Sequence, residues 1–225
     1  MRANEFLTEA PQQNTLVLMS GGFHPFHAGH MSLYIAAKKQ FPGATVVVGA
    51  TNDMDKRPFP FASKEKLAYL AGVEPGHFVE VNKQFNATEP SVEQFVKDPA
   101  NTVLIYVRSE KDKGTYPMPP KLDPQTGKLP LVTRGPRKGQ PVSDYLAYWP
   151  GPGKPLENMT RHGYMAYLPT VEFAGGLTSA SEIRSTWPTL DAEGKAKLVN
   201  QLYPKTMNND QLTQSAVSLL DSGMS

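Results

Sequence analysis

The sequence predicts an α/β fold built on a doubly wound parallel sheet, and three observations support this prediction. Apolar runs alternate with helical patterns through the first half of the chain. Several runs are continuous and rich in β-branched residues, as in residues 45–49, which is typical of strands buried on both faces. Each run is separated from the next by a stretch long enough for a crossover helix, so neighbouring strands should run parallel.

The elements of the first half follow in a regular order. We expect strands over residues 15–20, 45–49, 78–81 and 102–107, separated by helices over residues 29–41, 63–71 and 91–97. Pro42-Gly43 should end the first helix, since neither residue favours its continuation. Ser63 is expected to cap the second helix with its hydroxyl.

The regular pattern breaks between Ser109 and Met159, where prolines and glycines crowd together and no helical or strand period remains. This insertion also carries eight cations against few acids: Lys111, Lys113, Lys121, Lys128, Arg134, Arg137, Lys138 and Lys154. Three interpretations remain open, namely a solvated surface excursion, a basic lid over phosphates and an arm that binds a partner. We expect no regular element within it.

Regular structure should return after the insertion. One or both of the segments 164–168 and 171–173 should form the last strand of the sheet, and a helix should begin near Ser181. Residues 191–202 are amphipathic and should face the core with Ala196, Leu198, Val199 and Leu202. Residues 209–220 suggest a final helix before a frayed tail. We therefore expect one domain over residues 1–225, with an insertion at about 109–159 and a C-terminal helical extension at about 188–225.

Composition narrows the class of protein. The 225 residues suffice for one domain with a sizeable core, and the absence of cysteine excludes disulfides and thiolate metal sites. The net charge of +2 gives no argument for nucleic acid, which we do not expect among the partners. No apolar run is long enough to cross a bilayer, and residues 1–13 lack the apolar core of a signal peptide. We expect a cytoplasmic protein with no membrane partner; a homo-oligomer is compatible with the sequence.

The most informative segment follows the first predicted strand and reads Gly21-Gly22-Phe23-His24-Pro25-Phe26-His27-Ala28-Gly29-His30. It places a glycine-bearing loop at the start of a helix. A helix N-terminus has unpaired N–H groups and the positive end of the helix dipole, so it favours phosphate. The histidines can donate hydrogen bonds to phosphate oxygens, and the glycines let the backbone approach closely.

A second segment, Gly175-Gly176-Leu177-Thr178-Ser179-Ala180-Ser181-Glu182-Ile183-Arg184, has a similar character. Hydroxyl residues precede a helix start, and Arg184 lies one turn inside it. Such a segment can hold a polyphosphate through hydroxyls, free N–H groups and a guanidinium. The alternative is structural: Ser179 or Ser181 caps the helix and Arg184 is a surface cation.

The two segments together resemble the signatures of the nucleotidylyltransferase superfamily. Residues 27–30 match its His-x-Gly-His motif. Residues 178–184 are similar to its Ile-Ser-x-Thr-x-Ile-Arg motif, with Thr178 in place of isoleucine and Ser181 in place of threonine. The pair Pro25-Phe26 and the stretch Pro58–Lys66 are similar to archaeal-type nicotinamide mononucleotide adenylyltransferases. The chain departs from that branch at Gly22, at Ala28 and at residues 108–110, which leaves the acceptor open.

This resemblance implies a Rossmann-like fold and transfer of a nucleoside monophosphate to a phosphorylated acceptor with release of pyrophosphate. ATP would be the donor, with nicotinamide mononucleotide as the first-choice acceptor. One alternative is a cytidylyltransferase that uses CTP and a phosphosugar or phosphoalcohol. Another is a nucleotide-binding structural protein that has lost catalysis.

The resemblance also assigns roles to residues. His27, His30 and Arg184 would carry catalysis, and the nucleotide and its phosphates would contact Gly21, Gly22, Phe23, His24, Gly29, Lys56, Arg57, Ser179 and Ser181. Magnesium would bind mainly through the phosphates of the nucleotide, with few protein ligands. We expect no metal site made by the protein alone, although His24, His27 and His30 have a spacing that zinc could use.

Overall fold

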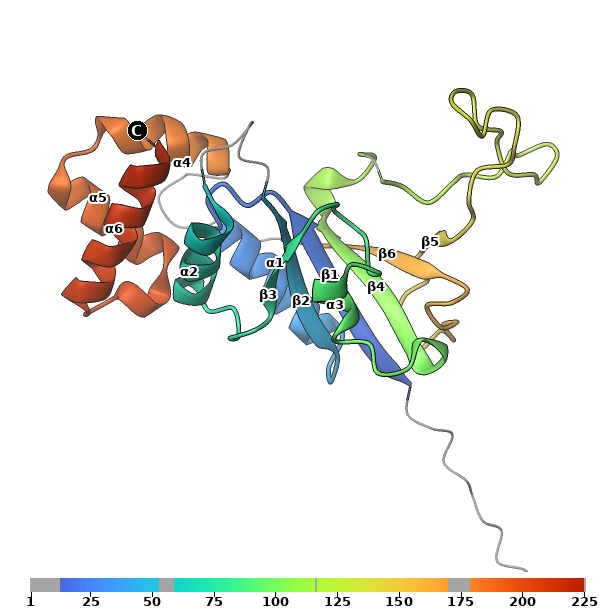
Figure 1. Cartoon of the computed structure of the whole chain (residues 1–225), viewed down its shortest axis with the longest axis horizontal. Helices are drawn as coiled ribbons and strands as arrows, with labels where there is room; N and C mark the ends of the chain where they lie inside the picture. The colour runs from blue at the N-terminus through green and yellow to red at the C-terminus, as the bar shows by residue number, and fades with distance from the viewer. Residues whose placement is uncertain (1–12, 53–58, 116, 170–178, 225) are drawn as a thin grey trace, which may run out of the picture.

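The computed structural model describes residues 13–52, 59–115, 117–169 and 179–224, and within them one parallel sheet forms the centre (Figure 1). Its strands are β1 (Asn14–Gly21), β2 (Thr45–Thr51), β3 (Phe78–Val81), β4 (Thr102–Ser109), β5 (Leu146–Tyr148) and β6 (Gly163–Leu168). Their order across the sheet is β3-β2-β1-β4-β6-β5, and every pair is parallel. This arrangement confirms the predicted fold class.

The helices cover the sheet unequally. They are α1 (Ala28–Gln40), α2 (Phe61–Ala71), α3 (Pro90–Glu93), α4 (Ala180–Thr186), α5 (Ala192–Leu202) and α6 (Asp210–Met224). Four 3-10 turns lie between the helices and strands of the described residues: η1 (Pro99–Asn101), η2 (Glu110–Asp112), η3 (Trp187–Thr189) and η4 (Pro204–Thr206). Helices α5 and α6 pack beside α2 at one end of the molecule, far from β5 at the other (Figure 1). No helix in the described part of the chain has the length and apolar character needed to cross a membrane.

Alternate residues of the strands face two separate cores. One face packs against α1, α2 and the C-terminal helices through side chains such as Val17, Val48, Ile105 and Ala166. The other face packs against α3 and the root of the insertion through Leu18, Val47, Leu104 and Met165. Because both faces are covered, the strands need continuous apolar sequence, which explains why they could be predicted.

Two predictions about the second half are wrong in detail. Strand β5 lies inside the segment where we expected no regular element, and it pairs with β6 from Leu146↔Gly163 to Tyr148↔Met165. Three residues at a sheet edge carry no period, so only their partner strand defines them. Helix α6 continues to Met224, where a frayed tail was expected after residue 220. The segment 171–173 lies outside the described residues.

Helix α2 also begins earlier than predicted. It starts at Phe61, and Ser63 lies within its first turn and does not cap it. The side chain of Asn52, at the end of β2, accepts a hydrogen bond of 3.1 Å from the N–H of Phe61. A residue distant in sequence thus supplies the cap, which local patterns could not reveal. Helix α3 spans four residues, shorter than the predicted 91–97.

The strand order creates a crevice at the carboxyl ends of β1 and β4. The chain runs from β1 outward to β3 on one side, and then returns to place β4 on the other side of β1. Loops that leave β1 and β4 therefore diverge, and open parallel sheets bind ligands at such a point.

Candidate active site

The loop between β1 and α1 is folded around the ring of Phe23. Phe23 has a φ of 51°, in the left-handed region, and its ring lies 4.9 Å from the ring of His30 in an edge-to-face contact. A Cβ on Gly21 would lie 2.8 Å from the Phe23 ring, closer than packed carbons approach. The glycine at this position is therefore required by the aromatic ring that supports His30.

Two histidines cap helix α1 with their side chains. Nδ1 of His27 accepts a hydrogen bond of 3.0 Å from the N–H of Gly29, and Nδ1 of His30 accepts one of 3.3 Å from the N–H of His27. Since both Nδ1 atoms accept, each neutral ring carries its proton on Nε2. The capping pattern thus leaves both histidines with an Nε2–H donor.

Burial keeps these histidines neutral at physiological pH. Burial lowers the pKa of His27 from 6.5 to about 4. The pKa of His30 is also well below its usual value, first because of burial and then because of the charge on His27. Their rings are tilted by 33° with centroids 3.8 Å apart, where two positive charges would repel each other.

Helix α4 brings the second motif to the same loop. Ser179 caps α4: its Oγ accepts a hydrogen bond of 3.2 Å from the N–H of Glu182, whose carboxylate accepts one of 3.0 Å from the N–H of Ser179. Arg184 donates from one Nη to the carbonyl of His24 and from the other to Oγ of Ser181 at 3.2 Å. The two motifs therefore meet directly, although 160 residues separate His24 from Arg184.

The C-terminal extension supports the first loop from behind. Tyr203, at the end of α5, is fully buried, and its hydroxyl donates a hydrogen bond of 2.8 Å to the carbonyl of Phe26. Burial raises the pKa of Tyr203, so the hydroxyl stays protonated and can donate. The predicted helical extension thus fixes the loop that carries the histidines.

A cavity of about 480 Å³ opens where these elements meet, at the carboxyl ends of β1 and β4. Seven predicted residues line it: Gly21, Gly22, Phe23, His24, His30, Ser181 and Arg184. Three other predicted residues do not: His27, Gly29 and Ser179. Instead, His27, Gly29 and Ser179 take part in the hydrogen bonds that cap α1 and α4. Lys56 and Arg57 lie outside the described residues.

Sequence reasoning missed four polar residues of the wall: Ser20, Gln84, Arg108 and Asp112. Arg108 is the penultimate residue of β4; it donates a hydrogen bond of 3.2 Å to the carbonyl of Thr115, and its Nε lies 3.8 Å from the carboxylate of Asp112. Ser20 and Arg108 lie near the ends of buried strands, and this position was the available signal. Gln84 lies in an irregular segment and Asp112 in the turn η2, and neither gave a signal.

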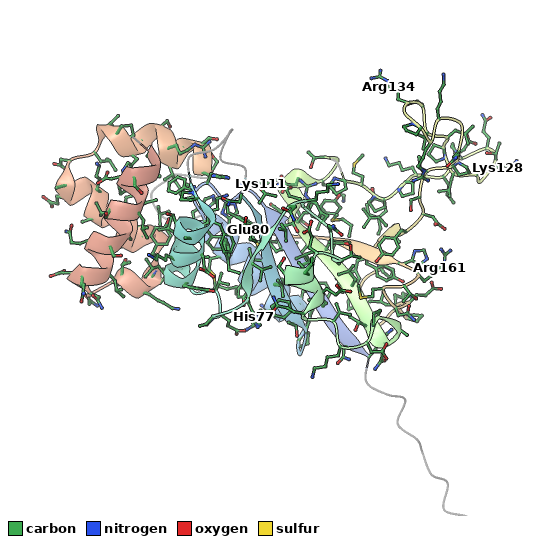
Figure 2. The ribbon with its side chains drawn as sticks, viewed as in Figure 1. His77, Glu80, Lys111, Lys128, Arg134 and Arg161 are labelled. Carbon is green, nitrogen blue, oxygen red and sulfur yellow. The ribbon has the colours of Figure 1, made fainter. Side chains whose placement is uncertain are left out.

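A second, polar hollow adjoins this cavity beyond β2 and β3. It has a volume of about 410 Å³ and shares Gln84 with the first cavity. Its other lining residues are Thr51, Asn52, Glu80 and Asn82, and none of them is aromatic. Figure 2 labels Glu80 over the centre of the sheet. Carboxylate and carboxamide groups in this arrangement can pair with hydroxyl groups.

The described residues contain no group of three or more histidine, cysteine or acidic side chains that could hold a metal ion. This finding goes against the zinc alternative for His24, His27 and His30. It leaves the expected magnesium untested, because an ion held by phosphates needs few protein ligands. Asp112 is the carboxylate that lines the first cavity.

Comparison with known proteins gives one family match and a distant likeness of fold. A family model described as cytidylyltransferase-like matches residues 18–113, which include the first motif and end before the second. No curated protein matches the chain.

Two solved structures resemble the chain in part. One is the crystal structure of a bifunctional NMN adenylyltransferase/ADP ribose pyrophosphatase from Francisella tularensis, at 14% identity and a TM-score of 0.44. The other is the same kind of protein complexed with AMP and Mn ion, at 13% identity and a TM-score of 0.43. Each match covers 92% of this chain, which spans about half of the other: 53% and 52%.

Proposed function

We propose that the chain is a nucleotidylyltransferase that transfers a nucleoside monophosphate from a nucleoside triphosphate to a phosphorylated acceptor. The observation that carries this proposal is the contact of Arg184 with the His24 carbonyl, which joins the two motifs at one cavity. The cytidylyltransferase-like match over residues 18–113 supports the same class of reaction.

The reaction requires positioning and charge stabilisation more than covalent chemistry. A phosphate oxygen of the acceptor attacks the α-phosphorus of the triphosphate, a new P–O bond forms, and the bond to the β-phosphate breaks to release pyrophosphate. In this proposal Nε2–H of His30 donates to an oxygen on the α-phosphorus, and Arg184 and Ser181 hold the β- and γ-phosphates. His27 keeps His30 in place through its backbone N–H, which donates to Nδ1 of His30, and through the contact between their rings.

Neutral histidines suit this task because they donate a hydrogen bond before charge develops. As negative charge grows on the phosphate oxygens, it attracts positive charge. Protonation of the nearby imidazole is therefore more favourable than in the empty cavity. When magnesium is bound, it neutralises phosphate charge. The lining residues fit an ion carried by the nucleotide, with Asp112 as the neighbouring carboxylate.

The first-choice reaction is adenylyl transfer from ATP to nicotinamide mononucleotide, as the residues Pro25-Phe26 and the stretch 58–66 suggest. The second candidate is cytidylyl transfer from CTP to a phosphosugar or phosphoalcohol. The adjoining polar hollow favours this candidate, because its acid and amide groups would pair with several hydroxyls and no aromatic ring offers a stacking surface.

Pyrophosphate release from the purified chain tests these assignments. Each nucleoside triphosphate would be combined with magnesium and, in turn, nicotinamide mononucleotide, phosphosugars and phosphoalcohols. Release with ATP and nicotinamide mononucleotide alone supports the first candidate, and release with CTP and a phosphorylated polyol supports the second. If no pair releases pyrophosphate but ATP still raises the melting temperature, the chain binds nucleotides without catalysis and the proposal fails.

The variant His30→Ala tests the histidine itself. Loss of one transition-state donor should lower kcat by about 10²–10³-fold, while the fold is retained. His162→Ala is the matched control, since His162 is also partly buried but lies just before β6 and does not line the cavity. An unchanged kcat per folded molecule in His30→Ala would show that His30 serves only in packing.

A further inference from the structure

The part of the insertion between η2 and β5 forms a projecting arm, which we define as residues 117–143. It leaves the body beyond the edge strand β5 (Figure 1). Its outer part is a hairpin loop with one isolated antiparallel β-bridge, between Leu131 and Pro141. The N–H of Val132 donates a hydrogen bond of 2.8 Å to the carbonyl of Gln140, and the N–H of Val142 donates one of 2.9 Å to that of Pro130. A turn stabilised by Asp123 precedes this hairpin.

The arm carries an unbalanced positive charge. It holds Lys121, Lys128, Arg134, Arg137 and Lys138 against Asp123 alone, so its net charge is 5 − 1 = +4. The whole chain has a net charge of +2, which leaves +2 − 4 = −2 for the rest. The small total charge therefore conceals a separation of charge between the arm and the body, a pattern typical of polyanion binding.

The cations of the arm are available for a partner. All five are exposed, and none forms an ion pair with another part of the chain that the structure describes. Figure 2 shows Lys128 and Arg134 at the outer end of the arm, away from the sheet. The carboxylate of Asp123 accepts hydrogen bonds from the N–H groups of Gln125 and Thr126 within its own turn.

The lid interpretation finds no support in this arrangement. No residue of the arm lines the cavity that holds His30 and Arg184. Figure 2 places Lys128 and Arg134 at the outer end of the arm, so a ligand held there would lie beside the catalytic site and not over it.

We propose that the arm binds a nucleic-acid duplex through its phosphates, without reading sequence. The arm contains no aromatic residue, so it cannot hold single strands by base stacking. Three of its five cations are lysines, which are common partners of phosphates but depleted at the centres of protein interfaces.

The composition of the arm lowers the cost of such binding. Seven of its 27 residues are proline, and these restrict the chain before any partner arrives. Less conformational entropy is therefore lost when the arm is ordered on a duplex. The phosphate contacts should make the affinity fall steeply with salt.

Fluorescence anisotropy with labelled 20-base-pair DNA and RNA duplexes tests the proposal on the full chain, without nucleotide. At about 50 mM salt we expect a dissociation constant in roughly the micromolar range. The triple variant Arg134→Gln, Arg137→Gln, Lys138→Gln should bind at least about 10-fold more weakly, and its slope of log K against log salt should be shallower by about 2–3.

Two further variants keep the result interpretable. The control Lys39→Gln, Lys83→Gln, Lys97→Gln removes the same charge from exposed residues of the body and should change the affinity less than about twofold. Arg137 also donates a hydrogen bond to the carbonyl of Pro141 within the hairpin of the arm. The variant Lys121→Gln, Lys128→Gln, Lys138→Gln therefore tests the effect of removing three charges while that hydrogen bond is retained.

Three outcomes would overturn the proposal. These are no binding to either duplex at low salt, an equal loss of affinity in the arm and body variants, and stronger competition by polyaspartate than by duplex, which would indicate an acidic protein partner. A preference for the DNA or the RNA duplex shows which of the two nucleic acids the arm binds. The measurement needs no turnover, so its result is independent of the proposed transferase activity.

Discussion

The cavity and the arm both carry positive charge, but they hold it in different ways. In the cavity, the guanidinium of Arg184 is fixed by the His24 carbonyl and by Ser181, and the neighbouring histidines are buried and neutral. On the arm, the five cations are exposed and have no ion pair in the described structure. Fixed donors can orient one ligand for a reaction, whereas free cations supply attraction that is independent of sequence.

Removal of the fixed guanidinium should have the largest effect. Arg184→Met should lower kcat/KM by about 10²–10³-fold, because a charged donor to the leaving phosphates is lost. Steady-state pyrophosphate release measures this change. Arg161→Met is the control, since Arg161 is an exposed arginine in a surface ion pair with Asp144. Equal activity of the two variants would show that Arg184 has only a structural role.

The stability of the cavity region should depend on pH because of its neutral histidines. The pKa of His27 is about 4 in the folded chain and near 6.5 when unfolded, so between these values the unfolded chain binds more protons. The free energy of unfolding should therefore fall as pH decreases from 6.5 to 4, by on the order of 3 kcal/mol for His27.

Urea unfolding at several pH values, compared with His27→Asn, measures this contribution. Asparagine retains a good helix cap but does not titrate, so the variant should have a shallower pH dependence over the same window. Variants in the arm should leave the pH dependence unchanged. Parallel curves for wild type and His27→Asn would mean that His27 is not held neutral by burial.

The rigidity of the cavity can be loosened without any change of charge. Gly21→Ala should destabilise the fold by about 1–3 kcal/mol, because the new Cβ would displace the Phe23 ring that supports His30. Thermal melting and kcat measure the two consequences. The double variant Gly21→Ala, Phe23→Leu should recover part of the stability but not the activity. Full activity in Gly21→Ala would show that the position of His30 tolerates movement.

The smallest effect is expected from the arm on catalysis. The triple variant Arg134→Gln, Arg137→Gln, Lys138→Gln should retain kcat/KM within about twofold, because no residue of the arm lines the cavity. The same pyrophosphate assay provides the measurement. A loss of activity above about tenfold would place the arm over the bound substrate and would favour the lid interpretation.

Much of the fold could be predicted because the strands are buried on both faces. Their continuous apolar runs identify β1, β2, β3 and β4, and Ser179 and Asp191 cap helices where the sequence pattern placed helix starts. The prediction failed where distant residues define an element. Strand β5 depends on β6, and the start of α2 depends on the Asn52 side chain.

The candidate site divides in the same way. Local sequence located the two helix starts that carry the motifs, but it could not show that His30 lines the cavity and that His27 does not, although both cap α1. Gln84, Arg108 and Asp112 join the wall from three separate segments, so only the folded chain brings them there.

The sequence by itself determined the parallel sheet, the position of the two motifs and the proline-rich, basic character of the insertion, because each depends on neighbours within a few residues. The tertiary structure decided that Arg184 meets the loop of His24, that His27 does not line the cavity and that the arm projects away from it. These relations join residues far apart in the chain, and they are fixed by how the strands order and the helices pack.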